Sequence, residues 1–175
     1  MQWRMRGRCW KFGDDILNDG GISSLELVRA GIFDPRELAK ACMQGVDPEF
    51  PSKAQAGDIL VAGQNFGKGQ LHVQGPLSIK GMGLGLVTES MPRSFFRLAV
   101  AAGVLMLPFT AGITGQVNDG DDLEIDFGTG LIRNHTTGAT VQGQPLPEAL
   151  LDIVAAGGER AWLAKNYGTG KGGGR

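Results

Sequence analysis

Residues 57–76 decide the fold, and they read GDILVAGQNFGKGQLHVQGP. The apolar run from Ile59 to Ala62 has the length of a strand, and glycine lies on both sides of it, which indicates a strand buried on both faces. A loop rich in glycine follows, and the spacing of apolar residues from Pro76 to Met82 predicts a helix. This order of strand, glycine-rich loop and helix is typical of the first half of a unit with two parallel strands.

The same order continues along the chain. We expect a second strand over Leu84 to Thr88, a second helix over Pro92 to Ala102 and a third strand over Val104 to Pro108. In the second helix, phenylalanine, leucine and alanine recur at helical intervals. Two such units in series predict a parallel sheet with right-handed crossovers.

Two further elements are predicted in the segment that precedes these strand–helix units. Residues 1–12 read as a first strand, and Asp34-Pro35 supplies an N-cap and a first-turn proline for a short helix over Arg36 to Met43. The prolines of Asp47 to Pro51 predict that this segment has no regular structure.

After the third predicted strand, Gln116 to Arg133 shows the alternation of apolar and polar residues, and the turn residues, of short antiparallel strands. Leu146 to Ala156 reads as a closing helix, and residues 159–167 as a short helical turn. We therefore expect one α/β domain over residues 1–167, with a central, partly parallel sheet flanked by helices and a small antiparallel β part. Residues 168–175 read as a flexible, glycine-rich tail.

Composition excludes several classes of protein. The 175 residues carry 17 basic and 18 acidic side chains, so no overall positive charge favours nucleic acid or an anionic membrane. The two cysteines, Cys9 and Cys42, have no metal-ligand spacing, which argues against a zinc finger, a self-contained iron–sulfur site or any other bound metal. No apolar stretch has the form of a signal peptide or a membrane span, and we expect a cytoplasmic protein.

The loop from Gly63 to His72 is the best candidate for a functional site. Its glycines allow backbone amides to approach a ligand, and the helix that follows favours anions at its N-terminus. Lys68 and His72 add charged or titratable groups. Neither GxGxxG nor GxxxxGK[ST] aligns with this loop, which disfavours a nucleotide. A glycine turn that only packs a helix on a sheet is the alternative.

Four separated stretches resemble the small subunit of isopropylmalate dehydratase, a member of the aconitase swivel-domain family. Residues 57–67 resemble the stretch that precedes the active-site loop of that family, and the similarity covers roughly residues 8–165. The other matching positions are 34–40 with 47–50, then Ser90, Arg93, Phe95, Arg97 and Gly103, and finally 118–121 with Asp126 and Gly130.

This resemblance implies a swivelling β/β/α domain that works as one subunit of a hydro-lyase. The substrate would be a hydroxy di- or tricarboxylic acid, as in leucine biosynthesis. The partner would be a large subunit that carries a [4Fe–4S] cluster and all of its ligands, so that this chain binds no cofactor itself. The swivel domain would lend substrate-binding and proton-transfer groups to the cluster at the interface between the subunits.

The loop itself departs from the family. Members read roughly Asn-Phe-Gly-Cys-Gly-Ser-Ser-Arg, where this chain has Lys68 for the cysteine, Gln70-Leu71 for the serines and His72 for the arginine. In the family a serine of that pair is the base, and the arginine binds a substrate carboxylate. Neither glutamine nor leucine can act as a base, and histidine lacks the bidentate guanidinium.

The changed loop leaves three interpretations open. In the first, Lys68 or His72 takes over proton transfer, and both are candidate catalytic residues. In the second, the chain is a non-catalytic carboxylate-binding or regulatory subunit that keeps the fold. In the third, it is an ordinary isopropylmalate dehydratase subunit that uses other groups. The candidate substrate-binding residues are Asn65, Gly67, Gly69, Gln70 and Asp19.

Overall fold

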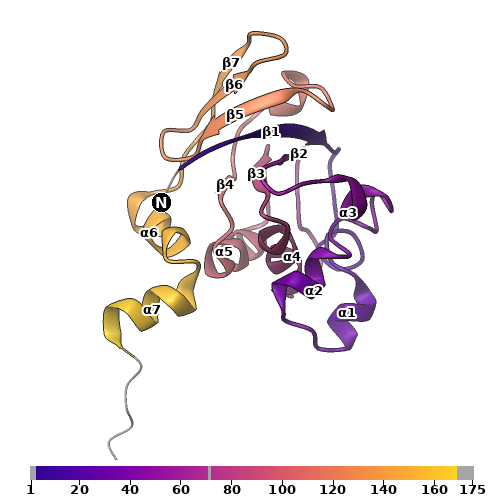
Figure 1. The fold of residues 1–175 in the computed structure, drawn as a ribbon, viewed down its shortest axis with the longest axis vertical. Coiled ribbons are helices and arrows are strands. Elements are labelled where there is room, and N and C mark those ends of the chain that lie inside the picture. Colours follow the sequence, from indigo (N-terminus) through magenta and orange to yellow (C-terminus); the bar gives the residue numbers. More distant parts are fainter. Residues whose placement is uncertain (1–2, 71, 169–175) are drawn as a thin grey trace, which may run out of the picture.

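A seven-stranded sheet in the order β4-β3-β2-β1-β5-β6-β7 organises the chain in a computed structural model that describes residues 3–70 and 72–168. Helices lie around one half of this sheet, and the other half is an antiparallel ribbon (Figure 1). The strands are β1 (Arg4–Lys11), β2 (Ile59–Ala62), β3 (Gly85–Thr88), β4 (Met106–Leu107), β5 (Asp122–Asp126), β6 (Leu131–Asn134) and β7 (Thr140–Gln142). The helices are α1 (Leu25–Arg29), α2 (Pro35–Ala39), α3 (Phe50–Lys53), α4 (Gln74–Met82), α5 (Arg93–Ala102), α6 (Glu148–Ala155), α7 (Glu159–Tyr167) and the 3-10 helix η1 (Ile113–Gly115).

The strands β1 to β4 form the parallel half that the sequence predicts. β2 pairs in parallel with both β1 and β3, and every residue of β2 and β3 is buried. α4 connects β2 to β3 and α5 connects β3 to β4, and the two helices lie side by side beneath these strands (Figure 1). The parallel arrangement brings the ends of β1, β2 and β3 to the same edge of the sheet.

The antiparallel half shares β1 with the parallel half. β5 pairs with β1 in antiparallel register from Arg4 opposite Asp126 to Arg8 opposite Asp122, and β6 and β7 extend the ribbon. β1 therefore runs across the molecule between its two parts (Figure 1). This mixed sheet confirms the α/β class with a partly parallel centre and a small antiparallel part.

Several local predictions differ from the structure. The helix that begins after Asp34 ends at Ala39, not at Met43. The prediction of no regular structure at 47–51 is wrong, because α3 begins at Phe50 with Pro51 in its first turn, where a missing N–H costs nothing. The helical turn predicted at 159–167 is the full nine-residue helix α7.

Two further expectations concern the whole chain. The flexible tail predicted from residue 168 lies, apart from Gly168, outside the described residues, and the single domain over 1–167 stays a prediction. Within residues 3–70 and 72–168, no helix is long and apolar enough to cross a membrane.

Asp58 fixes the start of β2 against β1, and its loss is expected to destabilise the fold. Its carboxylate accepts hydrogen bonds from the indole of Trp10 at 2.9 Å and from the backbone N–H groups of Arg8 and Gln55 at 3.1 and 2.9 Å. Asp58→Ala leaves these donors unpaired near the core, which should lower the free energy of unfolding by about 1–3 kcal/mol. Urea denaturation measures the loss, and Asp152→Ala, at an exposed position of α6, should change stability by less than about 0.5 kcal/mol. Equal stabilities of the two variants would contradict this role.

Candidate functional site

The loops that follow β1, β2 and β3 meet at one edge of the sheet. The N–H of Gly63 donates to the carbonyl of Gly13 at 3.1 Å, and the N–H of Asp15 donates to the carbonyl of Gln64 at 2.7 Å. The loop after β3 joins them, because the N–H of Asn65 donates to the hydroxyl of Ser90 at 3.0 Å. Ligands of parallel sheets bind at this carboxyl edge, where such loops come together.

We call residues 63–72 the glycine loop and residues 13–19 the acidic segment, and these two run side by side. Leu17 and Lys68 form a parallel bridge. The N–H groups of Gly67 and Lys68 both donate to the carbonyl of Ile16, at 2.8 and 3.1 Å, and the N–H of Asn18 donates to the carbonyl of Lys68 at 2.8 Å. The contacts position the side chains of both segments on the same part of the surface.

Lys68 forms an ion pair with Asp15 across these two segments. Its ammonium lies 3.0 Å from Oδ1 of Asp15, and the side chains are 41% and 54% exposed. The side-chain amide of Asn65 donates to the same oxygen at 3.0 Å. Hydrogen bonds from Lys68 and then from Asn65 hold the pKa of Asp15 below its ordinary value. An exposed pair of this kind contributes little to stability, so Lys68 can turn to an anionic ligand at small cost.

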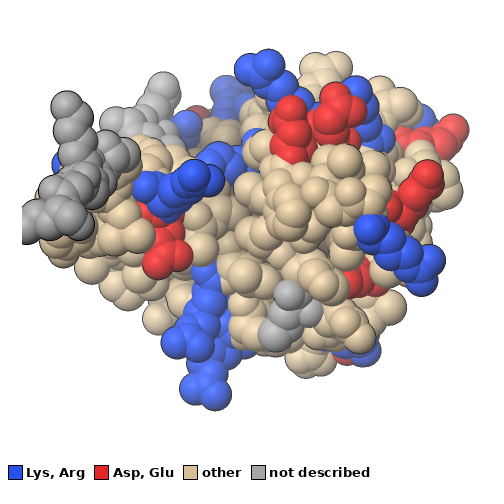
Figure 2. Space-filling model, turned by 90° about the horizontal axis from the view of Figure 1, so that it is seen from below, with Lys and Arg blue, Asp and Glu red and all other residues tan. Residues whose placement is uncertain are grey.

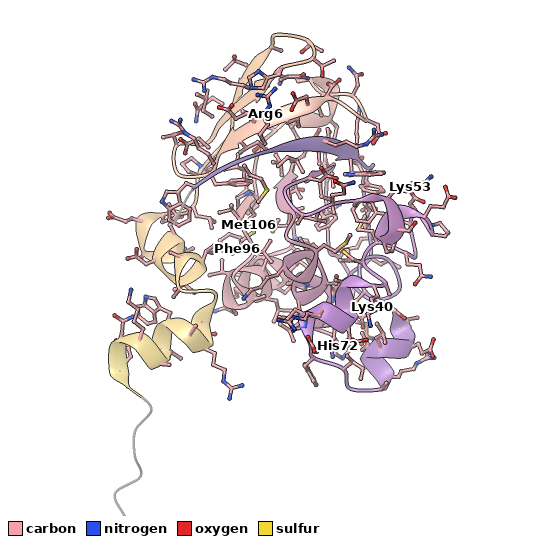
Figure 3. All side chains as sticks on the ribbon, in the orientation of Figure 1. Arg6, Lys40, Lys53, His72, Phe96 and Met106 are labelled. Atoms are coloured by element: carbon pink, nitrogen blue, oxygen red, sulfur yellow. The ribbon has the colours of Figure 1, made fainter. Side chains whose placement is uncertain are left out.

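His72 forms a second pair, with Asp19, at the end of the glycine loop. Nδ1 of the imidazole lies 2.5 Å from Oδ2 of Asp19. The Asp19 side chain is 8% exposed, whereas that of His72 is 44% exposed. His72 therefore rests on a buried carboxylate and presents its other edge to the surface, beside the start of α4 (Figure 3).

The remaining predicted binding residues differ in what they offer a ligand. Gly67 has a φ of +80° and lies against the ring of Phe95, and its N–H is already bonded to Ile16. Gly69 is exposed with a φ of +93°. Gln70 is exposed, and its backbone carbonyl accepts a hydrogen bond from the side chain of Asn18. Gly67 thus shapes the loop, whereas Gly69 and Gln70 lie at its surface.

The surroundings of the two pairs are open. A cavity of about 490 Å³ adjoins the acidic segment at Gly13 and Asp14, and a second of about 280 Å³ lies just beyond the segment, at Gly20. Neither cavity has Lys68 or His72 in its lining. The face seen in Figure 2 is mostly uncharged in its middle, with charged residues toward the rim. Leu17 and Leu25, both beside the site, are exposed. The surface around Lys68 and His72 is therefore open and partly apolar.

Three further residues take part in the arrangement around Lys68 and His72. Asp15 pairs with Lys68, Ser90 binds the backbone of the glycine loop, and Asn18 is fully buried between the two segments. The Asx-rich turn at 14–19 is the sequence signal for Asp15 and Asn18. Among the described residues, no group of three or more His, Cys, Asp and Glu side chains has a geometry that could hold a metal ion.

Comparisons with known proteins agree with this fold. No protein-family model matches the chain. The isopropylmalate/citramalate isomerase small subunit of Methanocaldococcus jannaschii is 41% identical over 162 residues, which cover 92% of this chain and 94% of that protein. The 3-isopropylmalate dehydratase small subunit of Methanosarcina acetivorans is 43% identical over 155 residues, which cover 88% of this chain and 93% of that protein. A crystal structure of 3-isopropylmalate dehydratase from M. jannaschii superposes with a TM-score of 0.85 at 34% identity, covering 94% of this chain and 95% of that one.

Proposed function

Since this chain belongs to the family of 3-isopropylmalate dehydratase small subunits, we propose that its glycine loop supplies the proton-transferring and carboxylate-binding groups of a two-subunit hydro-lyase. The chain is the small subunit of an aconitase-superfamily lyase of leucine biosynthesis. Its partner is a large subunit, which in our proposal carries a [4Fe–4S] cluster and encloses the site. The substrate is a hydroxy di- or tricarboxylic acid, and the enzyme works in the cytoplasm.

Lys68 and His72 divide the chemistry between them in this proposal. Lys68 leaves its ion pair with Asp15 and binds a substrate carboxylate, which its ammonium attracts as a point charge. Nε2 of His72 accepts the proton of the carbon next to that carboxylate. The electron pair of the broken C–H bond forms the C=C bond, and hydroxide leaves from the neighbouring carbon. The partner's cluster would supply the Lewis acid for that hydroxyl.

The remaining candidates complete the substrate site. Asn65 keeps Asp15 in place through its amide, so that Lys68 returns to a fixed position after each turnover. Gly69 and Gln70, exposed beside Lys68, leave room for the substrate and offer a side-chain amide to a hydroxyl or carboxylate. Gly67 sets the shape of the loop.

The observation that carries the proposal is the pairing of His72 with a buried carboxylate, at the loop position where the family pattern that this sequence resembles has an arginine. An imidazole held in this way replaces the base that is lost with the family's serines. The alternative is a regulatory subunit that merely kept the fold. The names of the relatives, which are dehydratase and isomerase subunits, do not favour that alternative.

The proposed function is tested by recovery of the complex. The tagged chain is purified anaerobically from its own host, the bound protein is analysed for iron and sulfide, and hydration is assayed on a panel of unsaturated di- and tricarboxylates. We expect an iron–sulfur large subunit and turnover of at least one panel member. Recovery of the chain alone, or of a partner without iron, would contradict the proposal and favour a binding subunit.

Within that complex, Lys68→Met is expected to weaken substrate binding. A hydrogen bond to a charged group is worth about 1.5–3 kcal/mol, so KM should rise about 10–100-fold. Lys40→Met serves as the matched control, because Lys40 also forms an exposed ion pair, with Glu37, but lies on the end of α2. The control should leave KM unchanged. An unchanged KM in Lys68→Met would remove Lys68 from the substrate site.

A further inference from the structure

We propose that Asp19 is a positioning residue that holds His72 in the tautomer with its proton on Nδ1, so that Nε2 is free to accept a proton. The inference rests on the proposed function, and it deepens that function by assigning Asp19 a role other than direct contact with substrate. Three features of the described residues carry it. They are the hydrogen bonds of the Asp19 carboxylate, the frame that holds both partners, and the exposure of the imidazole.

Both carboxylate oxygens of Asp19 have a hydrogen-bond partner. Oδ2 lies 2.5 Å from Nδ1 of His72, and Oδ1 accepts the side-chain amide of Asn18 at 3.0 Å. An ionised carboxylate only accepts hydrogen bonds, and a neutral imidazole has one donor and one acceptor nitrogen. The nitrogen that faces Asp19 must therefore be the donor. With its side chain 8% exposed and both oxygens engaged, Asp19 has little left to offer a substrate.

Asn18 fixes the two partners to one rigid frame. It is fully buried, and its side-chain NH2 group shares its two hydrogens among three acceptors: the backbone carbonyls of Gln70 and His72, at 3.0 and 2.9 Å, and Oδ1 of Asp19, at 3.0 Å. α4 packs against it so closely that a Cβ on Gly75 would lie 1.9 Å from its side-chain oxygen. One buried amide thus holds the carboxylate and the backbone of the histidine together, and the pair is preorganised.

The opposite edge of the imidazole is free. Among the described residues, Nδ1 is the ring nitrogen of His72 that has a hydrogen-bond partner, and the side chain is 44% exposed. The pair Lys68–Asp15 differs, because both of its side chains are largely exposed and no buried group fixes them. The two pairs therefore suit different tasks. Lys68 is a movable charge, whereas His72 is an oriented base whose tautomer is set by the group beneath it.

The tautomer can be observed in the isolated chain. Two-bond ¹H–¹⁵N correlation spectra at about pH 9, where an ordinary imidazole is neutral, distinguish a protonated Nδ1 from a protonated Nε2. The chain has two histidines, so a His135→Asn variant assigns the signals. We expect His72 to carry its proton on Nδ1. A proton on Nε2, alone or together with one on Nδ1, would overturn the proposal.

Asp19→Asn is the informative variant, because it keeps the size of the side chain. Its oxygen can still accept from Asn18 while its amide donates to Nδ1, which inverts the tautomer of His72. We expect this inversion, together with a fall of about 10²–10⁴-fold in kcat of the complex and little change in KM. Asp15→Asn, which alters the neighbouring pair, should leave the tautomer as in the wild type.

The possible outcomes separate this inference from the proposed function. An inverted tautomer with an unchanged kcat would overturn the positioning role, and so would a lower kcat without any inversion. Absence of turnover in the wild-type complex would instead refute the proposed function, and the catalytic half of this inference with it. The spectra of the isolated chain would still decide whether Asp19 sets the tautomer.

Discussion

His72→Gln is expected to lower the kcat of the complex by about 10²–10⁴-fold, the usual contribution of a general base. Glutamine is similar in length, and its amide can still donate a hydrogen bond to Asp19, but it accepts no proton at neutral pH. The change therefore removes the proposed proton acceptor and keeps the contact below it. Initial rates of hydration and dehydration measure the effect on the anaerobically purified complex.

The chain offers a matched control for this variant. His135 is the other histidine, and its Nε2 lies 3.3 Å from Glu124 on the ribbon strand β5, outside the glycine loop and the acidic segment. His135→Gln should leave kcat unchanged. If His72→Gln also retained full turnover while the complex stayed intact, the base would have to be sought elsewhere, and Lys68 would be the next candidate.

The central fold is predictable because its signals are local. β2 and β3 are short apolar runs. The helices α4 and α5 end at Gly83 and Gly103, both in the left-handed region, a few residues before the next strand begins. Glycine is the residue that favours this end of a helix. The order of strands and helices can therefore be read from the sequence, and the parallel pairing follows from their alternation.

Elements without such signals are harder to predict. α1 has five residues, no buried side chain and no capping hydrogen bond from a side chain, and β7 has three residues. α3 forms although Pro51 lies within it, because a proline in the first turn needs no hydrogen-bond donor. These elements depend on their neighbours in space more than on their own composition.

The sequence predicts that the candidate site lies in the glycine loop, but it does not predict the two side-chain pairs within the site. The glycine loop is recognisable from its composition, and so are Lys68 and His72 as the titratable groups within it. Their partners Asp15 and Asp19 lie about fifty residues earlier, within a turn whose Asx residues have the usual role of capping. The bridge between Leu17 and Lys68 aligns the two segments so that Lys68 lies beside Asp15 and His72 beside Asp19. The sequence contains no local signal for that alignment.

Gly67→Ala is the second large effect we expect, and it acts on the loop as a whole. The φ of Gly67 is +80°, and an ideal Cβ would lie 2.2 Å from the ring of Phe95. Phe95 is fully buried and packs edge to face on Phe66 with 5.4 Å between ring centroids, so it has little room to move. The left-handed backbone should cost about 1–2 kcal/mol and the overpacking about 1–3 kcal/mol.

The loss of about 2–5 kcal/mol that these two costs imply is a large part of the stability of an ordinary domain. Urea denaturation measures it, and Gly115→Ala is the control, because a Cβ there would meet no atom within 4 Å and its φ is not in the left-handed region. A Gly67→Ala variant as stable as this control would contradict the tight contact with Phe95.

A double variant separates the two costs of Gly67→Ala. Phe95→Leu removes part of the ring that the new methyl group would strike, so the effects of the two substitutions should be non-additive. The cost of the left-handed backbone remains in the double variant, because it belongs to residue 67 alone. Turnover should stay low in both variants that carry alanine, since Lys68 follows directly, and a displacement of about 1 Å costs an enzyme about 10²-fold in rate. Stability recovered without activity would show that Gly67 serves the position of Lys68 as well as the packing of the loop.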